Sequence, residues 1–349
     1  MRTFSVFLVS FFSAVILTPL VMRLARRLKI LDHVDEKRKI HNKPMPLLGG
    51  LSVFVSFYLA LIFSKVNISE PQIKGLIIGS TIIFITGLIT DINEPSAQIR
   101  LLFHVLASLV IIKSGIVLNF LPRTFWGIIG TWILTIVWVV GITNALNCLD
   151  GLDGLAAGMT GISAFCFFVI TAVTRQFQVD FIFLALFGSC LGFLIYNISP
   201  AKIFLGDAGS TFIGFVLAST AIMGTWAEDN IVRLSIPVLI LGVPIFDMVF
   251  TTIMRVKNRQ VTNLIEWMDY VGKDHFHHRL VDLGLRTKGA VFFIYAVGAI
   301  LGTSAIVLLN APWSDALLLV FQAILVFILI SVLMVIGKRR RSGWNLKED

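Results

Sequence analysis

Charged residues are scarce in this sequence, and that scarcity decides the class of protein. Of its 349 residues, 14% are Asp, Glu, Lys or Arg and 57% are hydrophobic, whereas soluble domains have about 25% charged and about 45–50% apolar residues. An ordinary soluble enzyme is therefore excluded, and we predict an all-α, polytopic membrane protein. The net charge of +9 then reports membrane topology and contact with anionic membrane lipid, and we expect no nucleic-acid partner.

Cysteines and processing signals are also sparse. Cys148, Cys166 and Cys190 are odd in number and have no metal-ligand spacing, so we expect free thiols. Residues 1–22 lack a clear basic start and a small-residue cleavage site, and Pro19 interrupts them, so we expect a retained first span. No polar stretch is long enough to fold alone, and residues 1–349 are expected to form one integral membrane domain.

Long apolar runs are what the chain has in abundance. We count eleven, each near the length of about 20 residues that crosses the hydrocarbon of a bilayer. They cover residues 4–22, 48–63, 75–90, 101–118, 126–142, 155–173, 181–196, 210–226, 234–254, 290–309 and 316–336. An odd number of spans places the two termini on opposite sides of the membrane.

Basic residues set the orientation of these spans. With the N-terminus outside, 22 of the 29 Lys and Arg residues fall on the inner side, as the positive-inside rule requires. Nearly every Asp, His and Lys that could do chemistry then faces the cytoplasm, which argues against a channel, because a channel needs polar groups through its full depth. The predicted cytoplasmic segments are loops 23–47, 91–100, 143–154, 197–209 and 255–289 and the basic tail 337–349.

One polar stretch, residues 144–158, reads N-A-L-N-C-L-D-G-L-D-G-L-A-A-G and follows an apolar run. It places Asn144, Asn147, Asp150 and Asp153 at a membrane face. Carboxylates at the edge of a membrane are costly unless they hold a cation, pair with a base or line a polar cavity. An ordinary Asn/Asp/Gly turn is the alternative, but this density of Asn, Asp and Gly favours a functional site.

Five carboxylates lie at the ends of apolar runs, namely Asp91, Asp150, Asp153, Asp207 and Asp247. Hard oxygen ligands at this density favour Mg²⁺, or Mn²⁺, with a phosphate-bearing substrate completing the coordination. Individual members could instead cap helices, as Asp207 could for the eighth run. As a group, the carboxylates predict metal or phosphate chemistry.

Two further polar segments contain histidine and basic residues. Three of the six histidines fall within residues 275–278, just before Arg279; the spacing fits no standard zinc site, so we expect an anion such as a diphosphate, or sugar hydroxyls, to bind there. A solvated loop is the alternative. The basic residues 37–43 are either a positive-inside anchor or the start of a shaped re-entry through the P-M-P-L-L-G-G turn at 44–50.

These features together favour phosphoryl transfer to a lipid phosphate. Attack of one anion on a diphosphate is opposed by charge repulsion, which metal and Arg, Lys or His side chains would offset. An ion-coupled carrier that uses the intramembrane carboxylates is the alternative from another class. A carrier should have repeated halves and helices interrupted on both faces, and neither pattern is visible in the sequence.

Three motifs, taken in order, resemble those of a known family. They are the 144–158 stretch, N-I-S-P-A-K-I-F-L-G-D-A-G-S at 197–210 and D-H-F-H-H-R-L at 274–280. The chain resembles the polyprenyl-phosphate N-acetylhexosamine-1-phosphate transferases over nearly its whole length. It is most similar to their bacterial undecaprenyl-phosphate GlcNAc-1-phosphate branch, and it lacks the histidine-loop pattern of the muramoyl-pentapeptide branch.

The resemblance implies a reaction and a place for it. It implies eleven spans, cytoplasmic catalysis in the bacterial inner membrane, UDP-GlcNAc as donor, undecaprenyl phosphate as acceptor, Mg²⁺ and release of UMP. Enzymes of this branch start the synthesis of cell-surface polysaccharides such as lipopolysaccharide antigens and teichoic acids. Another UDP-N-acetylhexosamine stays open as the donor, and a homodimer stays open as the assembly.

The resemblance also suggests roles for individual residues. Asp207 matches the metal-binding position, and Asp91, Asp150 and Asp153 match catalytic positions. The substrate-binding candidates are Lys39, His41, Asn144, Asn147, Lys202, Asp247, His275, His277, His278 and Arg279.

One position departs from the family pattern. Thr90 stands where the family usually has the first Asp of a pair with Asp91, and Arg100 and His104 stand where it has Lys and Gln. A phosphate monoester has a second pKa near about 6 and is mostly ionised at neutral pH. We therefore expect Thr90 to be tolerated, with Asp91 supporting the metal or a basic side chain.

Overall fold

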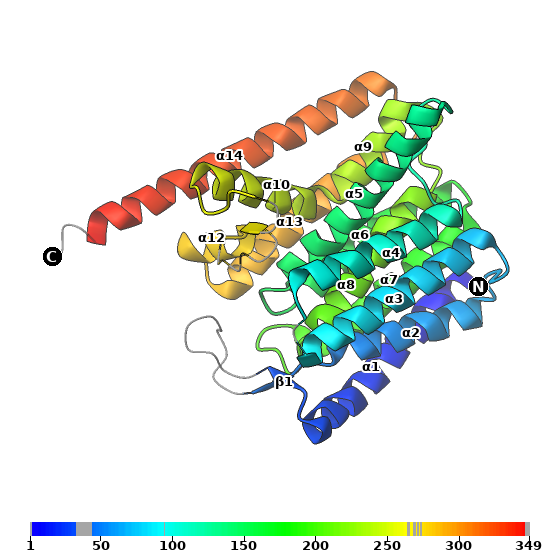
Figure 1. Ribbon diagram of the computed structural model, residues 1–349, viewed down its shortest axis with the longest axis horizontal. Helices are drawn as coiled ribbons and strands as arrows, with labels where there is room; N and C mark the ends of the chain where they lie inside the picture. The colour runs from blue at the N-terminus through cyan, green and yellow to red at the C-terminus, as the bar shows by residue number, and fades with distance from the viewer. Residues whose placement is uncertain are drawn as a thin grey trace. The chain divides into compact units, whose positions relative to one another are not determined.

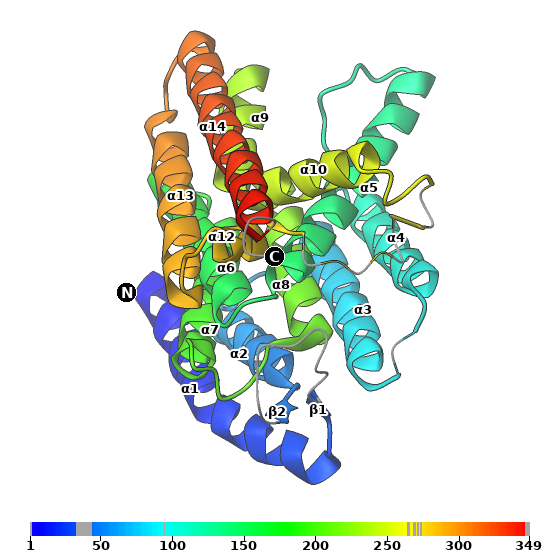
Figure 2. The same cartoon turned by 90° about the vertical axis from the view of Figure 1, so that its left-hand side faces the viewer.

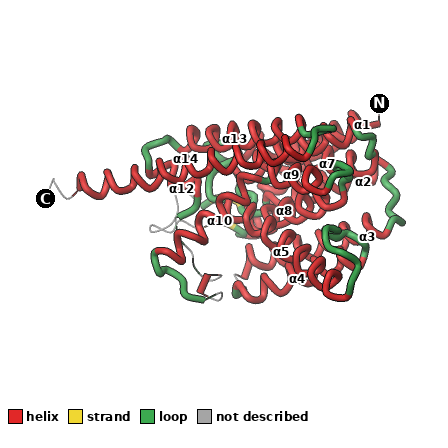
Figure 3. The backbone as a smooth tube through the Cα atoms, turned by 90° about the horizontal axis from the view of Figure 1, so that it is seen from above, coloured by secondary structure: helices red, strands yellow, loops and turns green. Residues whose placement is uncertain are grey.

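The computed structural model describes residues 2–32, 44–93, 95–263, 266–267, 270, 272 and 274–345. Nearly all of these residues are helical, as the tube in Figure 3 shows, so the predicted all-α class is confirmed. The helices are α1 (Arg2–Leu28), α2 (Gly49–Ser64), α3 (Pro71–Asn93), α4 (Ala97–Lys113), α5 (Phe125–Leu149), α6 (Leu155–Val173), α7 (Phe177–Asn197), α8 (Gly206–Met223), α9 (Asn230–Ile240), α10 (Gly242–Lys257), α12 (Phe276–Asp282), α13 (Thr287–Val307) and α14 (Trp313–Asn345).

The helices are long and apolar enough to identify a multi-pass membrane protein. Among the described residues, eight helices could each cross a bilayer, and α9 with α10 makes a ninth candidate if the pair is one broken span. Helices α2 and α4 have 16 and 17 residues, shorter than the roughly 20 residues of a typical spanning helix. The count of eleven spans and the sides of the two termini therefore stay predictions.

The chain forms two compact units, Met1–Thr225 and Trp226–Asp349. The first unit contains helices α1 to α8, which run side by side in Figure 1. A short antiparallel pair of strands, β1 (Leu31–Asp32) and β2 (Met45–Pro46), contacts α1, and Figure 2 shows the pair near one end of that helix. Both units contain membrane-length helices, so the division leaves the predicted single membrane domain undecided.

Helix α8 is the core of the first unit. It is the most buried of the candidate spans and packs against α2, α3, α5, α6 and α7. Small residues let the neighbouring backbones approach closely. A Cβ atom at Gly50 would lie 2.3 Å from the backbone nitrogen of Gly209, and one at Gly87 would lie 2.5 Å from Cα of Ala208. The first turn of α8 is therefore pressed against the start of α2 and the end of α3.

The second unit contains the predicted ninth span, residues 234–254, as two helices. Helices α9 and α10 meet there at an angle of 77°. Pro237 lies inside α9, and Gly242 and Pro244 open α10. Proline lacks a backbone N–H and its ring clashes with the preceding turn, so a straight helix through these positions is disfavoured.

Candidate active site

Helix α8 is capped by a carboxylate from another helix. Its own N-cap residue, Leu205, has an apolar side chain and makes no capping bond. Asp91, at the end of α3, takes that place: its Oδ1 accepts from the N–H of Asp207 at 2.7 Å, and its Oδ2 accepts from the N–H of Ala208 at 3.1 Å. Both oxygens thus satisfy orphan donors of the first turn and lie at the positive end of the helix dipole.

Glycines make this close contact feasible. Gly206 has φ of +76°, and a Cβ there would lie 2.7 Å from Oδ2 of Asp91. On the other side, the N–H groups of Gly49 and Gly50 donate to the carbonyl oxygens of Phe204 and Leu205 at 3.0 and 2.8 Å. The P-M-P-L-L-G-G turn therefore docks on the segment that leads into α8.

The stretch after α5 is tied to the loop after α7. Asp153 Oδ2 accepts from the N–H of Ala201 at 3.0 Å. Asn197 accepts from the N–H of Gly154 at 3.1 Å and donates to the carbonyl of Ile203 at 2.9 Å. The bonds to Ala201 and from Gly154 join two segments more than 40 residues apart in sequence, so the structure places Asp153 in a loop-bracing position.

Asp150 lies in a strongly acidic setting. Burial raises the pKa of its carboxyl well above the usual range, and the carboxylates of Asp207, Asp91 and Asp153 raise it further. Arg100, in the first turn of α4, places NH1 3.3 Å from Oδ2 of Asp207, with both side chains about one-third exposed. Four of the five predicted carboxylates, from three segments, thus share one neighbourhood, and the fifth, Asp247, belongs to the second unit.

The two asparagines of the 144–158 stretch reach different partners. Asn147 Oδ1 accepts from the hydroxyl of Ser210 in α8 at 2.6 Å. Asn144 Nδ2 donates to the carbonyl of Val140 and lies 3.4 Å from Nδ1 of His104, which must accept because the amide nitrogen has no lone pair to offer. Only Asn147 is therefore seen bonded to the helix that carries Asp207.

The acidic neighbourhood fits a divalent cation. Among the described residues no three His, Cys, Asp or Glu side chains stand ready as a complete metal cage. Mg²⁺ seldom needs one, because it is usually bound by one or two carboxylates, waters and the phosphates of a substrate. The buried carboxyl of Asp150 beside other carboxylates is costly without a cation. Asp207, with Asp150 near it, is the donor set that suits this ion.

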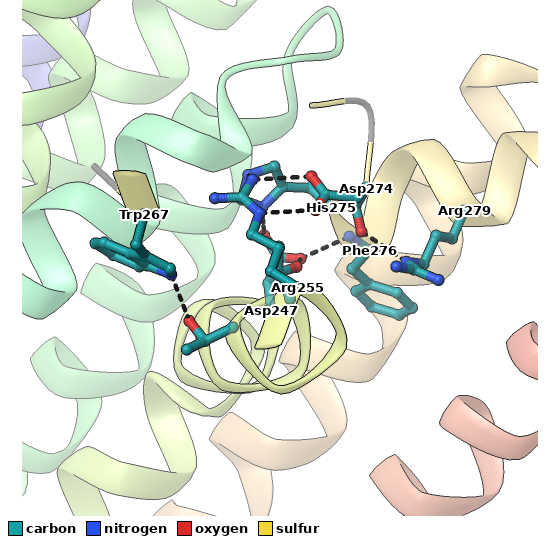
Figure 4. A network of polar contacts seen from close by, with 9 residues as sticks. Asp247, Arg255, Trp267, Asp274, His275, Phe276 and Arg279 are labelled. Atoms are coloured by element: carbon teal, nitrogen blue, oxygen red, sulfur yellow. Dashed lines mark hydrogen bonds and ion pairs between the residues drawn. The ribbon is translucent and has the colours of Figure 1, made fainter. Parts of the chain in front are cut away.

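In the second unit, the histidine loop is fixed by a buried polar network (Figure 4). Arg255 donates to Asp274 through Nε at 2.7 Å and through NH2 at 2.8 Å. Asp247 is fully buried; it accepts from the N–H of Phe276, and its Oδ2 lies 2.9 Å from Nδ1 of His275. Burial raises the pKa of Asp274, but the hydrogen bonds and charge of Arg255 outweigh it and hold that pKa below the usual range.

The other members of the loop differ in their surroundings. Arg279 is largely buried; its Nε donates to the carbonyl of Asp274 at 2.6 Å, and its guanidinium lies 5.0 Å from the ring centre of Phe250. His277 is fully buried, and neither ring nitrogen has a partner among the described residues. Burial lowers the pKa of His277 to about 3, so it is neutral at physiological pH. His278 is partly exposed, with its ring centre 4.2 Å from that of His277.

Three predicted candidates remain. Lys202 is exposed in the loop before α8. Lys39 and His41 lie outside the described residues, so their predicted roles stay predictions.

Several residues that shape the site were not predicted from the sequence. They are Arg100, Asn197, Ser210, Arg255 and Asp274. Arg255 had one available signal: it follows Asp247 by eight residues on α10 and therefore shares a face with it. Asn197 and Ser210 lay inside a recognised motif, but their partners are distant in sequence and could not be inferred from spacing.

Fold and site together define a polytopic all-α membrane protein with an acidic cluster at the start of a buried helix. Comparison with known proteins gives the family. Residues 73–225 match Glycosyl transferase family 4. The sequence is 34% identical to a Bacillus subtilis (strain 168) protein described as a probable undecaprenyl-phosphate N-acetylglucosaminyl 1-phosphate transferase, over 95% of this chain and 90% of that protein.

Two further relatives agree with this match. A decaprenyl-phosphate N-acetylglucosaminephosphotransferase of Mycobacterium leprae is 28% identical, over 86% of this chain and 83% of its own length. A phospho-N-acetylmuramoyl-pentapeptide-transferase of Halalkalibacterium halodurans is 33% identical, over 62% of this chain and 73% of its own length. The chain belongs to the polyprenyl-phosphate N-acetylhexosamine-1-phosphate transferases, a family of phosphoglycosyltransferases.

The cap on α8 yields a prediction for Asp91. Asp91→Ala should speed hydrogen exchange at the amides of Asp207 and Ala208 by about ten- to a hundredfold, because a hydrogen bond to a charged group contributes roughly 1.5–3 kcal/mol. Asp91→Asn, which keeps one acceptor oxygen, should have a smaller effect. Amides in the middle of α6 serve as an internal control, and unchanged exchange at residues 207 and 208 would refute the capping role.

The buried His277 yields a prediction for stability. Its folded pKa lies below the value of about 6.5 expected when unfolded, so the unfolded state binds the extra proton and stability falls as pH drops below that value. This group should contribute a slope of up to about 1.4 kcal/mol per pH unit. Between pH 7 and pH 5, the free energy of unfolding, measured by thermal unfolding, should fall less steeply with pH in His277→Phe than in the wild type. Equal slopes in the two proteins would contradict the lowered pKa of His277.

Proposed function

We propose that the chain transfers N-acetylglucosamine-1-phosphate from UDP-GlcNAc to undecaprenyl phosphate and releases UMP. The observation that carries this proposal is the acidic cluster at the start of α8. The chain is also 34% identical, over 95% of its length, to the Bacillus subtilis protein described as a probable undecaprenyl-phosphate N-acetylglucosaminyl 1-phosphate transferase. The product would begin a cell-surface polysaccharide. The site would face the cytoplasm at the bacterial inner membrane, because most basic residues fall on that side.

The reaction joins two anions, so charge is its main obstacle. An oxygen of the acceptor phosphate forms a bond to the β-phosphorus of the donor. The bond from that phosphorus to the bridging oxygen breaks, and UMP leaves with the electron pair. Mg²⁺ or Mn²⁺ held by Asp207 and Asp150 would neutralise the diphosphate. Arg100, 3.3 Å from Asp207, adds positive charge at the same place, and such electrostatic stabilisation is often the largest catalytic contribution.

This geometry leaves little need for a carboxylate base. Both oxygens of Asp91 accept backbone N–H groups, and Thr90 is buried with its hydroxyl donating to the carbonyl of Thr86 at 3.0 Å. The acceptor phosphate is itself an anion at neutral pH. Asp91 therefore holds the backbone of Asp207 in place through a hydrogen bond. The acceptor phosphate attacks without a carboxylate base at position 90 removing a proton.

The second unit offers a place for an apolar chain. A cavity of about 400 Å³ lies in the bend between α9 and α10 and is also lined by α13 and α14. Its walls include Ile245, Phe246, Leu301 and Phe327, and Ser331 is the one hydroxyl side chain among the described lining residues. A space of this size and composition suits several isoprene units of a polyprenyl phosphate, whereas the histidine loop of the same unit carries the polar contacts proposed for the donor.

The activity is tested by measuring UMP release. Purified protein should release UMP from UDP-GlcNAc only when undecaprenyl phosphate is present. UDP-GalNAc and UDP-glucose, offered in parallel, test the donor sugar. Faster UMP release from UDP-GalNAc would identify UDP-GalNAc as the preferred donor. If no UDP-sugar released UMP while an active relative did so as positive control, the transferase assignment would be refuted.

The role of the carboxylates is tested at Asp207. Asp207→Asn should lower the rate by about 10²–10³-fold or more, the loss typical when one group that stabilises transition-state charge is removed. Chelation should silence the wild type, and Mg²⁺ or Mn²⁺ should restore it. Asp315→Asn, at an exposed site in the first turn of α14, is the matched control and should keep the wild-type rate. A wild-type rate in Asp207→Asn would contradict the proposed metal site.

A further inference from the structure

His275 is held between a carboxylate and a guanidinium, and this decides where its proton lies. Nε2 lies 3.3 Å from NH2 of Arg255, and Nδ1 lies 2.9 Å from Oδ2 of Asp247. A guanidinium has donors and no acceptor. Nε2 must therefore accept from Arg255, and the proton sits on Nδ1, where it donates to Asp247. The geometry requires the neutral Nδ1–H tautomer.

Both partners of this ring are themselves immobilised. Arg255 makes the bidentate bond to Asp274, its side chain is 6% exposed, and it lies 4.6 Å from the ring centre of Tyr270. Asp247 is fully buried and also accepts from the N–H of Phe276. Asp247 and Arg255 are eight residues apart on one face of α10. Figure 4 shows the side chains of that helix and of the loop converging on His275.

The loop beyond His275 has a different character. The ring of His277 is nearly parallel to that of His275, at 7° and 6.1 Å between centres, yet its two nitrogens have no partner among the described residues. A fully buried imidazole without hydrogen bonds is costly. The two histidines therefore differ. Both ring nitrogens of His275 are bonded within the protein, whereas those of His277 have no partner among the described residues.

We propose that His275 is a positioning residue, which locks residues 274–280 onto α10 through the Asp247–His275–Arg255 bridge, and that donor contacts belong to the histidines after it. The proposal rests on the donor-binding role given to this loop above. It revises the expectation that all three histidines bind substrate. His275 acts through the loop and touches neither the sugar nor the phosphates.

Two side chains can each reproduce one half of the bridge. In His275→Asn, the amide Nδ2 occupies the place of Nδ1 and can still donate to Asp247. In His275→Gln, the amide oxygen reaches the place of Nε2 and can accept from Arg255, but the buried carboxylate loses its donor. His275→Ala loses both contacts.

The first test compares donor kinetics of the three variants. Since the Asp247 contact is the shorter of the two, 2.9 Å against 3.3 Å for Arg255, kcat/KM for UDP-GlcNAc should fall by about 100-fold in His275→Ala and by less than about tenfold in His275→Asn, with His275→Gln close to the alanine variant. The pH–rate profile of His275→Asn should keep the wild-type shape, because a positioning residue exchanges no proton with the substrate. The proposal is overturned if kcat/KM falls as far in His275→Asn as in His275→Ala and falls less in His275→Gln. That result would instead make the ring of His275 a substrate contact.

The second test is independent of activity. Hydrogen exchange at residues 274–283 of the substrate-free protein should quicken in His275→Ala and stay near wild type in His275→Asn. The double variant Asp247→Asn/His275→Ala should be no worse than the worse single variant, since both break one bridge. Unchanged exchange in His275→Ala would overturn the positioning role. If the wild type released no UMP, the proposed function would fail while the exchange result would still decide this inference.

Discussion

The first turn of α8 is the point on which the acidic site depends. A helix begins with N–H groups that lack partners, and at the start of α8 the residue in the N-cap position, Leu205, offers no cap. Asp91 fills that need from the end of α3. Because the backbone of Asp207 is one of the two groups bound, the contact that completes the helix also fixes the residue proposed to hold the metal.

The same contact concentrates negative charge. Asp91, Asp150, Asp153 and Asp207 lie in one neighbourhood that burial makes unfavourable for anions. Arg100 offsets part of this charge through a single bond of 3.3 Å that remains open to solvent, and an exposed pair of this kind contributes little on its own. The site is therefore short of positive charge. The divalent cation proposed to bind there with the donor diphosphate would meet that shortage, which links the electrostatics of the fold to the proposed chemistry.

Sequence patterns predicted the helical class, the acidic group and the family, because apolar periodicity, motif order and span ends are local properties. They did not predict that α9 and α10 are bent apart, although Pro237 and Pro244 were visible, since apolar content alone defined the span. They also treated Asp91 and His275 as open functional groups. Their partners, Ala208 and Arg255, are respectively 117 and 20 residues away, and only the folded chain shows that their polar atoms are already bonded.

We expect the acidic cluster around Asp207 to bind one divalent cation. Mn²⁺ is a paramagnetic substitute for Mg²⁺, so a titration of the substrate-free protein followed by electron paramagnetic resonance counts bound ions directly. The wild type should bind one Mn²⁺ per chain, Asp315→Asn should bind the same, and Asp207→Asn should lose the site. Equal Mn²⁺ binding by Asp207→Asn and the wild type would contradict the claim.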